Sequence, residues 1–144
     1  MARHCETFEH TADVGLSAWG DSLGELLAAL AEGLTDVICD RRAVGSGQVR
    51  SIHVEAEDVE SAAVDFLSQV LYAFDADGFL AREATIEAVV AAADARTNIR
   101  AELAGEPYDP DRHEIKTEVK AVTYHQLKIA PQGRRWQGRV ILDL

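Results

Sequence analysis

Cysteine, proline and methionine are scarce in this chain of 144 residues, which has two cysteines, three prolines and one methionine. Cys5 and Cys39 are far apart in the sequence, so they match neither a disulfide framework nor a zinc-binding pattern. Long apolar runs are also missing after the N-terminus, which argues against a signal peptide or a membrane span. We therefore expect a cytoplasmic protein in a reducing compartment.

Basic residues are few, because 14 Lys and Arg stand against 25 Asp and Glu, and the formal net charge is −11. A surface of this sign repels phosphate backbones, so we expect no direct affinity for nucleic acid. A basic protein partner or a cation is easier to accommodate. With 47% hydrophobic and 27% charged residues, the composition is that of a globular protein. The length predicts one domain spanning residues 1–144.

The spacing of apolar residues predicts two helices among several strands. Ser22 and Glu25 form a capping box for a helix that should end near Cys39. A second apolar stripe begins at Val59, and the helix should end at Gly78. Strands are expected at residues 4–9, 14–19, 49–56, 79–80, 83–91, 98–103, 114–124, 127–129 and 136–142, with a loop at 105–111 and a turn at 131–133. This order predicts a single α+β domain with a mixed or antiparallel sheet and the two main helices packed on one face.

Carboxylates near the two ends of the chain are candidate metal ligands. Asp143 ends the last expected strand, and Asp13 precedes the strand that begins the domain's alternating pattern. If these ends meet in the sheet, Asp13, Asp143 and the α-carboxylate of Leu144 offer oxygen donors for a hard cation, calcium or magnesium rather than zinc. The structural alternative is that Asp143 is a solvated terminal residue and that Asp13 caps the turn before Gly15.

Lys120, His10 and His125 each allow a functional and a structural interpretation. Lys120 lies among apolar residues. It is either a catalytic or phosphate-binding ammonium, or a lysine whose side chain faces the solvent on one side of a sheet. The two histidines are either ligands or general bases, or hydrogen-bonded structural imidazoles. No nucleophile elbow, phosphate-binding glycine loop or metalloprotease pair is present in the sequence.

Three segments taken together resemble the archease family: Phe8–Gly15, Val119–His125 and Val140–Leu144. The resemblance spans essentially the whole chain, in size, acidity, order of elements and position of the three motifs. It implies an accessory protein, not an enzyme, for the GTP-dependent RNA ligase of the RtcB type. That ligase joins a 2′,3′-cyclic phosphate or 3′-phosphate end to a 5′-hydroxyl end in tRNA splicing and RNA repair. Members of the family promote guanylylation and multiple turnover of the ligase.

The resemblance also implies roles for individual residues. The metal site of the family falls on Asp13, on Asp143 and on the terminal Leu144, with calcium as the expected ion and magnesium or manganese as alternatives. The lysine that the family needs for function falls on Lys120, and His10 in the first motif is expected to take part in activation or partner contact. Between residues 40 and 110 the match is one of pattern, so the surface that meets the ligase is not assigned.

Two other classes of function stay open at this point. One is a stand-alone metal-dependent hydrolase that uses Asp13 and Asp143, although no general base beyond His10 is evident. The other is a chaperone-like module that binds proteins and carries an incidental cation.

Overall fold

The computed structural model describes residues 2–10 and 12–144, except for the side chains of residues 9 and 10. Its elements are β1 (Arg3–His10), β2 (Asp13–Gly20), α1 (Leu23–Ile38), the short 3₁₀ helix η1 (Arg41–Ala43), β3 (Gln48–Ala56), α2 (Val59–Asp77), β4 (Phe79–Val90), β5 (Thr97–Pro107), β6 (Ala121–Gln132) and β7 (Arg135–Asp143).

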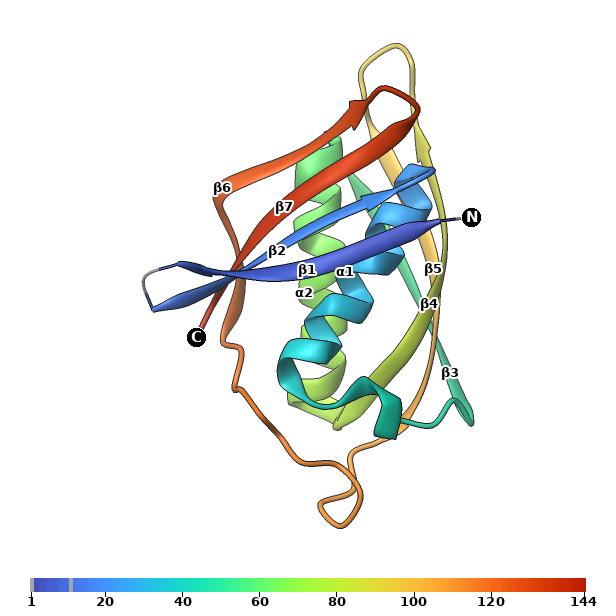
Figure 1. Ribbon diagram of the computed structural model, residues 1–144. Helices are drawn as coiled ribbons and strands as arrows, with labels where there is room; N and C mark the ends of the chain where they lie inside the picture. The colour runs from blue at the N-terminus through green and yellow to red at the C-terminus, as the bar shows by residue number, and fades with distance from the viewer. Residues whose placement is uncertain (1, 11) are drawn as a thin grey trace.

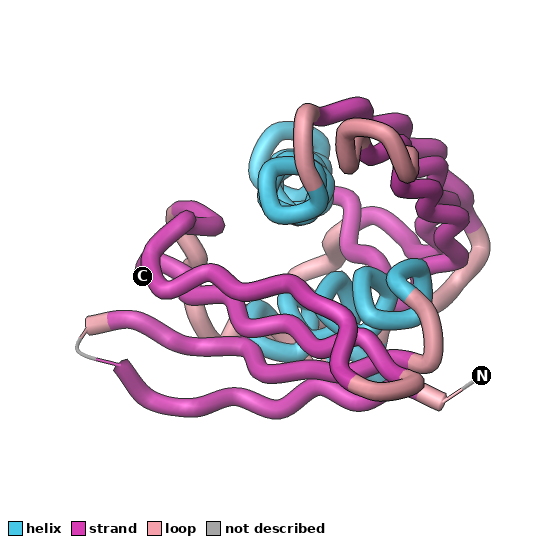
Figure 2. The backbone as a smooth tube through the Cα atoms, turned by 90° about the horizontal axis from the view of Figure 1, so that it is seen from above, coloured by secondary structure: helices cyan, strands magenta, loops and turns pink. Residues whose placement is uncertain are grey.

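These strands form two antiparallel sheets (Figure 1). One has four strands in the order β1-β2-β7-β6, and the other has three in the order β3-β5-β4. Helix α1 contacts β1 and β2 of the larger sheet and β4 of the smaller one, whereas α2 contacts β3, β4 and β6. Figure 2 shows both helices on the same side of the four-stranded sheet, and no described helix lies on its other side.

The expected α+β class is confirmed, with both helices on one face of the larger sheet. The strands divide between two sheets, which periodicity does not show because it reports the buried face of a strand and not its neighbour. Each sheet therefore presents an inner face to the helices and an outer face that no described helix covers. No helix among the described residues is long and apolar enough to cross a membrane.

Both helices begin and end where their capping residues predict. The Ser22 hydroxyl accepts a hydrogen bond from the Glu25 N–H at 3.1 Å, and α1 ends before Cys39. The Asp58 carboxylate caps α2 by accepting from the Ser61 N–H at 2.7 Å. Gly78 ends α2 with φ of 68°, a left-handed conformation that glycine adopts without strain.

Three strand boundaries differ from the prediction. Residues 79–90 form one strand, β4, with a register shift between Ala81 and Glu83, where we predicted two strands. Strand β5 runs on to Pro107, which pairs with Phe79 of β4 beyond the end of β3, so that Pro107 has a neighbouring strand on one side only, as at the edge of a sheet. Strand β6 continues through residues 131–132, which leaves Gly133 in the turn to β7.

Residues 114–120 are a fourth difference, since they form no strand although their pattern alternates. The chain here follows the C-terminal end of α1, where Ile115 bridges to Cys39 and the Lys116 N–H donates to the Ile38 carbonyl at 2.8 Å. Val119 is buried, so the alternation reflects packing of an extended segment against the helix. Strand β6 begins only at Ala121.

The core fills the space between the sheets with apolar side chains from both helices. Its largest fully buried members are Leu16, Leu26, Leu27, Leu30, Leu34, Phe66, Leu67, Leu80, Ile99, Leu103, Ile141 and Leu142. Cys5 and Cys39 are both free thiols, as expected. Burial raises the pKa of the Cys5 thiol to about 12, so this thiol stays protonated at neutral pH.

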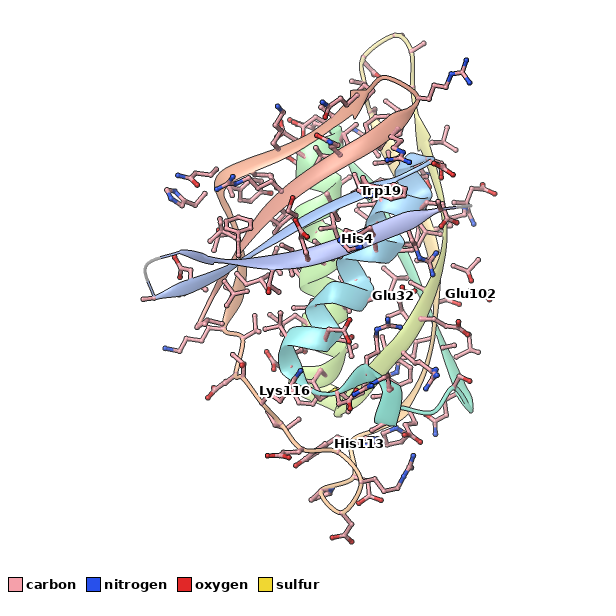
Figure 3. All side chains as sticks on the ribbon, in the orientation of Figure 1. His4, Trp19, Glu32, Glu102, His113 and Lys116 are labelled. Atoms are coloured by element: carbon pink, nitrogen blue, oxygen red, sulfur yellow. The ribbon has the colours of Figure 1, made fainter. Side chains whose placement is uncertain are left out.

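A buried histidine fixes the loop that follows β5. The His113 ring is fully buried, its Nδ1 accepts from the Asp109 N–H at 2.9 Å, and its Nε2 lies 2.7 Å from a Glu106 carboxylate oxygen (Figure 3). Because Nδ1 is the acceptor, Nε2 carries the proton and donates to Glu106. The same carboxylate accepts from Arg112 and from the Gly45 N–H, which ties the loop to the segment after η1.

This network predicts a specific loss of stability in acid. The Arg112 guanidinium, together with the hydrogen bonds from Gly45 and His113, lowers the pKa of Glu106 from 4.5 to about 2. A carboxyl group whose pKa is lower in the folded state stabilises the fold above pH 4.5, and this contribution is lost as the pH falls from 4.5 to 2. Melting temperatures measured between pH 6 and pH 2 should therefore fall more steeply for the wild type than for Glu106→Gln. Parallel curves for the two proteins would contradict this role.

Candidate functional site

Strands β2 and β7 lie side by side in the middle of the four-stranded sheet, and their register places Asp13 directly opposite Asp143. On the far side of β7, the register of β6 places Ala121 opposite Asp143, and the Lys120 N–H donates to the Asp143 carbonyl at 2.8 Å. On the far side of β2, His10 of β1 is opposite Asp13. Figure 1 shows the C-terminus beside the end of the β1–β2 hairpin and the start of β6.

The structure thus brings the backbones of the predicted site residues to one end of one sheet. Asp13 is half-buried, whereas Asp143 and Lys120 are exposed, so a partner molecule or an ion has access to them. The side chain of His10 lies outside the described residues, and its backbone pairing with Asp13 is what the structure gives. We call this group of residues, His10, Asp13, Lys120 and Asp143 with the adjoining Leu144, the terminal cluster.

The pairing of two aspartates has an electrostatic consequence. Directly opposed residues of neighbouring strands have Cβ atoms about 5 Å apart, and like charges in this position destabilise a sheet. A divalent cation held between the two carboxylates offsets that repulsion, and both donors are oxygen atoms, which calcium and magnesium prefer. The donor chemistry of Asp13 and Asp143 therefore fits a hard cation.

The described side chains alone do not complete a coordination shell. Among them, no group of three or more His, Cys, Asp or Glu converges in the way that a fully protein-bound metal requires. Two carboxylates are nonetheless a common donor set for a cation that keeps several of its water molecules, as magnesium usually does. Any further protein oxygen here has to come from the backbone or from Leu144, which follows Asp143 directly.

A large bulge in β6 lies beside the terminal cluster and was not predicted in this form. Thr123 is opposite Ile141 and Lys128 is opposite Arg139, so the residues between Thr123 and Lys128 loop out of the ladder. Within the bulge, Gln126 has φ of 51°, an uncommon conformation for a residue with a side chain. Bulges and strained residues of this kind concentrate next to functional sites.

Hydrogen bonds of Thr123 and Arg139 hold the bulge. The Thr123 hydroxyl donates to the Ile141 carbonyl at 2.9 Å and accepts from the His125 N–H at 3.3 Å. Arg139 then donates from Nη2 to the side-chain oxygen of Gln126 at 3.2 Å. The bulge carries His125, one of the ambiguous histidines, in an exposed position two residues beyond Thr123.

Arg139 also joins the bulge to the first strand. Its guanidinium lies over the Phe8 ring, 4.4 Å from the ring centroid, and the Phe8 ring itself occupies the space above Gly15. A Cβ atom on residue 15 would meet that ring, so glycine allows the aromatic side chain to lie flat on the sheet. One feature of the sequence points to Arg139: it lies an even number of residues from Asp143 along β7, so the two residues share a face of the strand.

The end of α2 has a structural role. Asp75 lies in the last turn of the helix, and Gly78 caps it, so the helix ends where Gly78 predicts. Burial, with a smaller contribution from Glu118, raises the pKa of Asp75.

Comparison with known proteins places these features in a family. Residues 5–144 match the Archease protein family (MTH1598/TM1083). Protein archease of Pyrococcus abyssi is 40% identical over 141 residues, covering 96% of this chain and 97% of the relative. Protein archease of Pyrococcus furiosus is 38% identical over 144 residues, covering 99% of each chain.

A solved structure agrees with the sequence relatives. The solution structure of Methanobacterium thermoautotrophicum protein 1598 superposes with a TM-score of 0.77 at 28% identity. The superposition covers 97% of this chain and 98% of that one. The family match and the curated relatives together show that the chain belongs to the archease family.

Proposed function

We propose that this protein is an accessory activator of a GTP-dependent RNA ligase of the RtcB type, which it helps to become guanylylated and to turn over repeatedly. The observation that carries the proposal is the pairing of Asp13 with Asp143 next to the backbone of Lys120. Membership of the archease family supports it, because the family resemblance rests on the same residues.

The proposed site holds one divalent ion, calcium in the first instance and magnesium or manganese as alternatives. Asp13 and Asp143 supply the carboxylates, and the α-carboxylate of Leu144 joins them where Leu144 is the last residue of the chain. When bound, the ion supplies positive charge that polarises and orients phosphate oxygens. The donor set of oxygen atoms favours these ions over zinc.

Lys120 has a separate proposed role. The segment that carries it lies along the edge of β7 opposite to β2, so β7 separates it from Asp13. A lysine ammonium is a mobile point charge that pairs with phosphate oxygens or with a carboxylate of the partner. His10, opposite Asp13, is proposed to contact the partner at the same end of the sheet. With a net charge of −11, the protein is attracted to a basic site built to hold RNA ends and GTP, and salt should weaken that attraction.

Ligase guanylylation tests the proposal. An RtcB-type ligase is incubated with radiolabelled GTP alone, with the wild type, with Asp143→Ala, and with Asp65→Ala as a matched control on the exposed face of α2. The wild type and Asp65→Ala should both increase labelling of the ligase. The increase caused by Asp143→Ala should be smaller by a factor of more than about ten, because one of the two carboxylates is removed.

Two results would count against this function. Equal stimulation by Asp143→Ala and Asp65→Ala would remove the terminal cluster from the mechanism. No stimulation by any of the proteins, the wild type included, would favour a protein-binding module whose cation is incidental.

A further inference from the structure

The outer face of the four-stranded sheet contains a hollow of about 410 Å³. One row of residues crosses it from strand to strand, with Glu6 on β1, Ser17 on β2, Arg139 on β7 and Lys128 on β6. The next row toward the far end of the sheet contributes Gln137, His4 and Trp19, and Figure 3 shows the last two in front of β1 and β2. We call this hollow the outer pocket. Along β7, Arg139 lies between the outer pocket and the terminal cluster.

The outer pocket concentrates positive charge in a strongly acidic protein. Lys128 and Arg139 are directly opposite one another, an arrangement that costs stability unless an anion lies between the two cations. Several other basic residues of the chain are paired with carboxylates, such as Arg3 with Glu25 and Arg112 with Glu106. Within the part of the chain that the structure describes, no carboxylate forms an ion pair with Lys128 or Arg139.

The geometry of the guanidinium leaves donors for a ligand. Arg139 has five N–H groups, and among the described residues one of them, on Nη2, donates to Gln126 while the plane of the group lies over Phe8. At the other end of the pocket, Arg135 is stacked on Trp19 at 3.8 Å from the ring centroid and forms no ion pair with a described carboxylate. Glu6, the acidic residue of the row, lies 3.4 Å from the His4 ring on β1, the strand furthest from Lys128.

These features define the chemistry of a ligand. Arg139 and Lys128 line the same hollow, and a guanidinium and an ammonium are the side-chain groups that recognise phosphate oxygens; the Ser17 hydroxyl in the middle of the row adds a neutral donor. The volume is within the range that holds a small organic molecule. An extended nucleic-acid strand is disfavoured, because the net charge of −11 repels phosphates outside the pocket.

We propose that the outer pocket binds the phosphate of a nucleotide, with Arg139 and Lys128 as the anion ligands and Ser17 as a hydrogen-bond donor. This site is distinct from the terminal cluster and needs neither the divalent ion nor the ligase. The phosphate belongs either to a free mononucleotide or to the terminal nucleotide of a strand, and the two sources share this chemistry.

Isothermal titration of the purified protein tests the site. The probes are a nucleoside 5′-monophosphate, the same nucleoside without phosphate, and a short single-stranded oligonucleotide with or without a terminal phosphate. The monophosphate should bind with one site per chain and the bare nucleoside should not, and affinity should fall as salt is raised. Tighter binding of the oligonucleotide that bears a terminal phosphate would assign the phosphate to a strand end, and equal or weaker binding would assign it to the free nucleotide.

Variants connect binding to the pocket. Lys128→Gln should weaken binding of the monophosphate about tenfold, as expected for the loss of one charged hydrogen bond. Lys116→Gln removes an equal charge beside α1, away from the outer pocket, and should bind as the wild type does (Figure 3). Arg139→Lys keeps the charge while removing the fork, and should also weaken binding.

Two results would overturn the proposal: no saturable binding of any probe that carries a phosphate, or equal affinity of Lys128→Gln and Lys116→Gln. Because these titrations contain no ligase, their outcome is independent of ligase stimulation. The titrations can therefore reject phosphate binding in the outer pocket without rejecting the activator function, and the guanylylation assay can reject the activator function without rejecting phosphate binding.

Discussion

Lys120→Ala and Asp13→Ala should both abolish stimulation of ligase guanylylation, and they should differ in what happens to ion binding. Asp13→Ala removes one of two opposed carboxylates, so calcium should no longer raise the melting temperature of the protein. Lys120→Ala removes a cation from the same end of the sheet and leaves both carboxylates in place. Its backbone N–H still donates to the Asp143 carbonyl, so the ladder and the calcium-dependent thermal shift should persist.

The measurements are a thermal melt with calcium or with chelator, followed by the guanylylation assay with each variant. For a ligand that binds only the folded protein, a concentration of 100 times its dissociation constant stabilises the fold by about 2.7 kcal/mol, a shift that a melt resolves easily. Lys116→Ala serves as the matched lysine control because its side chain lies beside α1. Full stimulation by both site variants would show that the terminal cluster is not the working part of the protein. Loss of the calcium shift in Lys120→Ala would show that the lysine and the ion site are not separable.

Phe66→Ala should give the largest loss of stability among the substitutions considered. The Phe66 ring has no exposed surface and lies on the inner side of α2, between the helix and the sheets. Truncating a buried phenylalanine removes its transfer free energy and leaves a cavity, which together cost about 3–5 kcal/mol of unfolding free energy. Urea unfolding followed by circular dichroism measures the difference.

Tyr72→Ala is the matched control for this loss. Tyr72 is an aromatic residue of the same helix, but 68% of its surface is exposed, so its removal should change the free energy of unfolding by no more than about 0.5 kcal/mol. Similar losses for the two variants would mean that α2 is stabilised by its own helix propensity and not by packing against the sheets.

The helices could be predicted from the sequence because their information is local. Ser22 and Glu25 are three residues apart, and Gly78 ends α2 through its own backbone conformation. The division of the strands into two sheets could not be predicted, because it depends on which strands pair across long stretches of chain. For the same reason the alternation at residues 114–120 predicts a strand, although it reflects packing along the end of α1.

The candidate site divides in the same way. Asp13 and Asp143 could be named from their chemistry and from the family resemblance, but their pairing depends on a register that only the structure gives. The sequence predicts an interruption at residues 125–126, between the strands expected at 114–124 and 127–129, but not that both parts pair with β7 as one bulged strand, since Gln126 is not a residue that usually adopts positive φ. Arg139 shares a face with Asp143 by parity, yet its contacts with Phe8 and Gln126 join three strands that lie far apart in the sequence.

The pairing of β2 with β7 has a kinetic consequence. It joins the second strand of the chain to the last, so nearly the entire polypeptide must be brought into a closed loop before Asp13 faces Asp143. Contacts between residues so distant in sequence carry a high loop-closure entropy and tend to form late in folding. During synthesis, the two carboxylates come together only after β7 has left the ribosome. An ion bound by both carboxylates would stabilise the pairing of β2 with β7, and it would have to dissociate before β7 separates from β2.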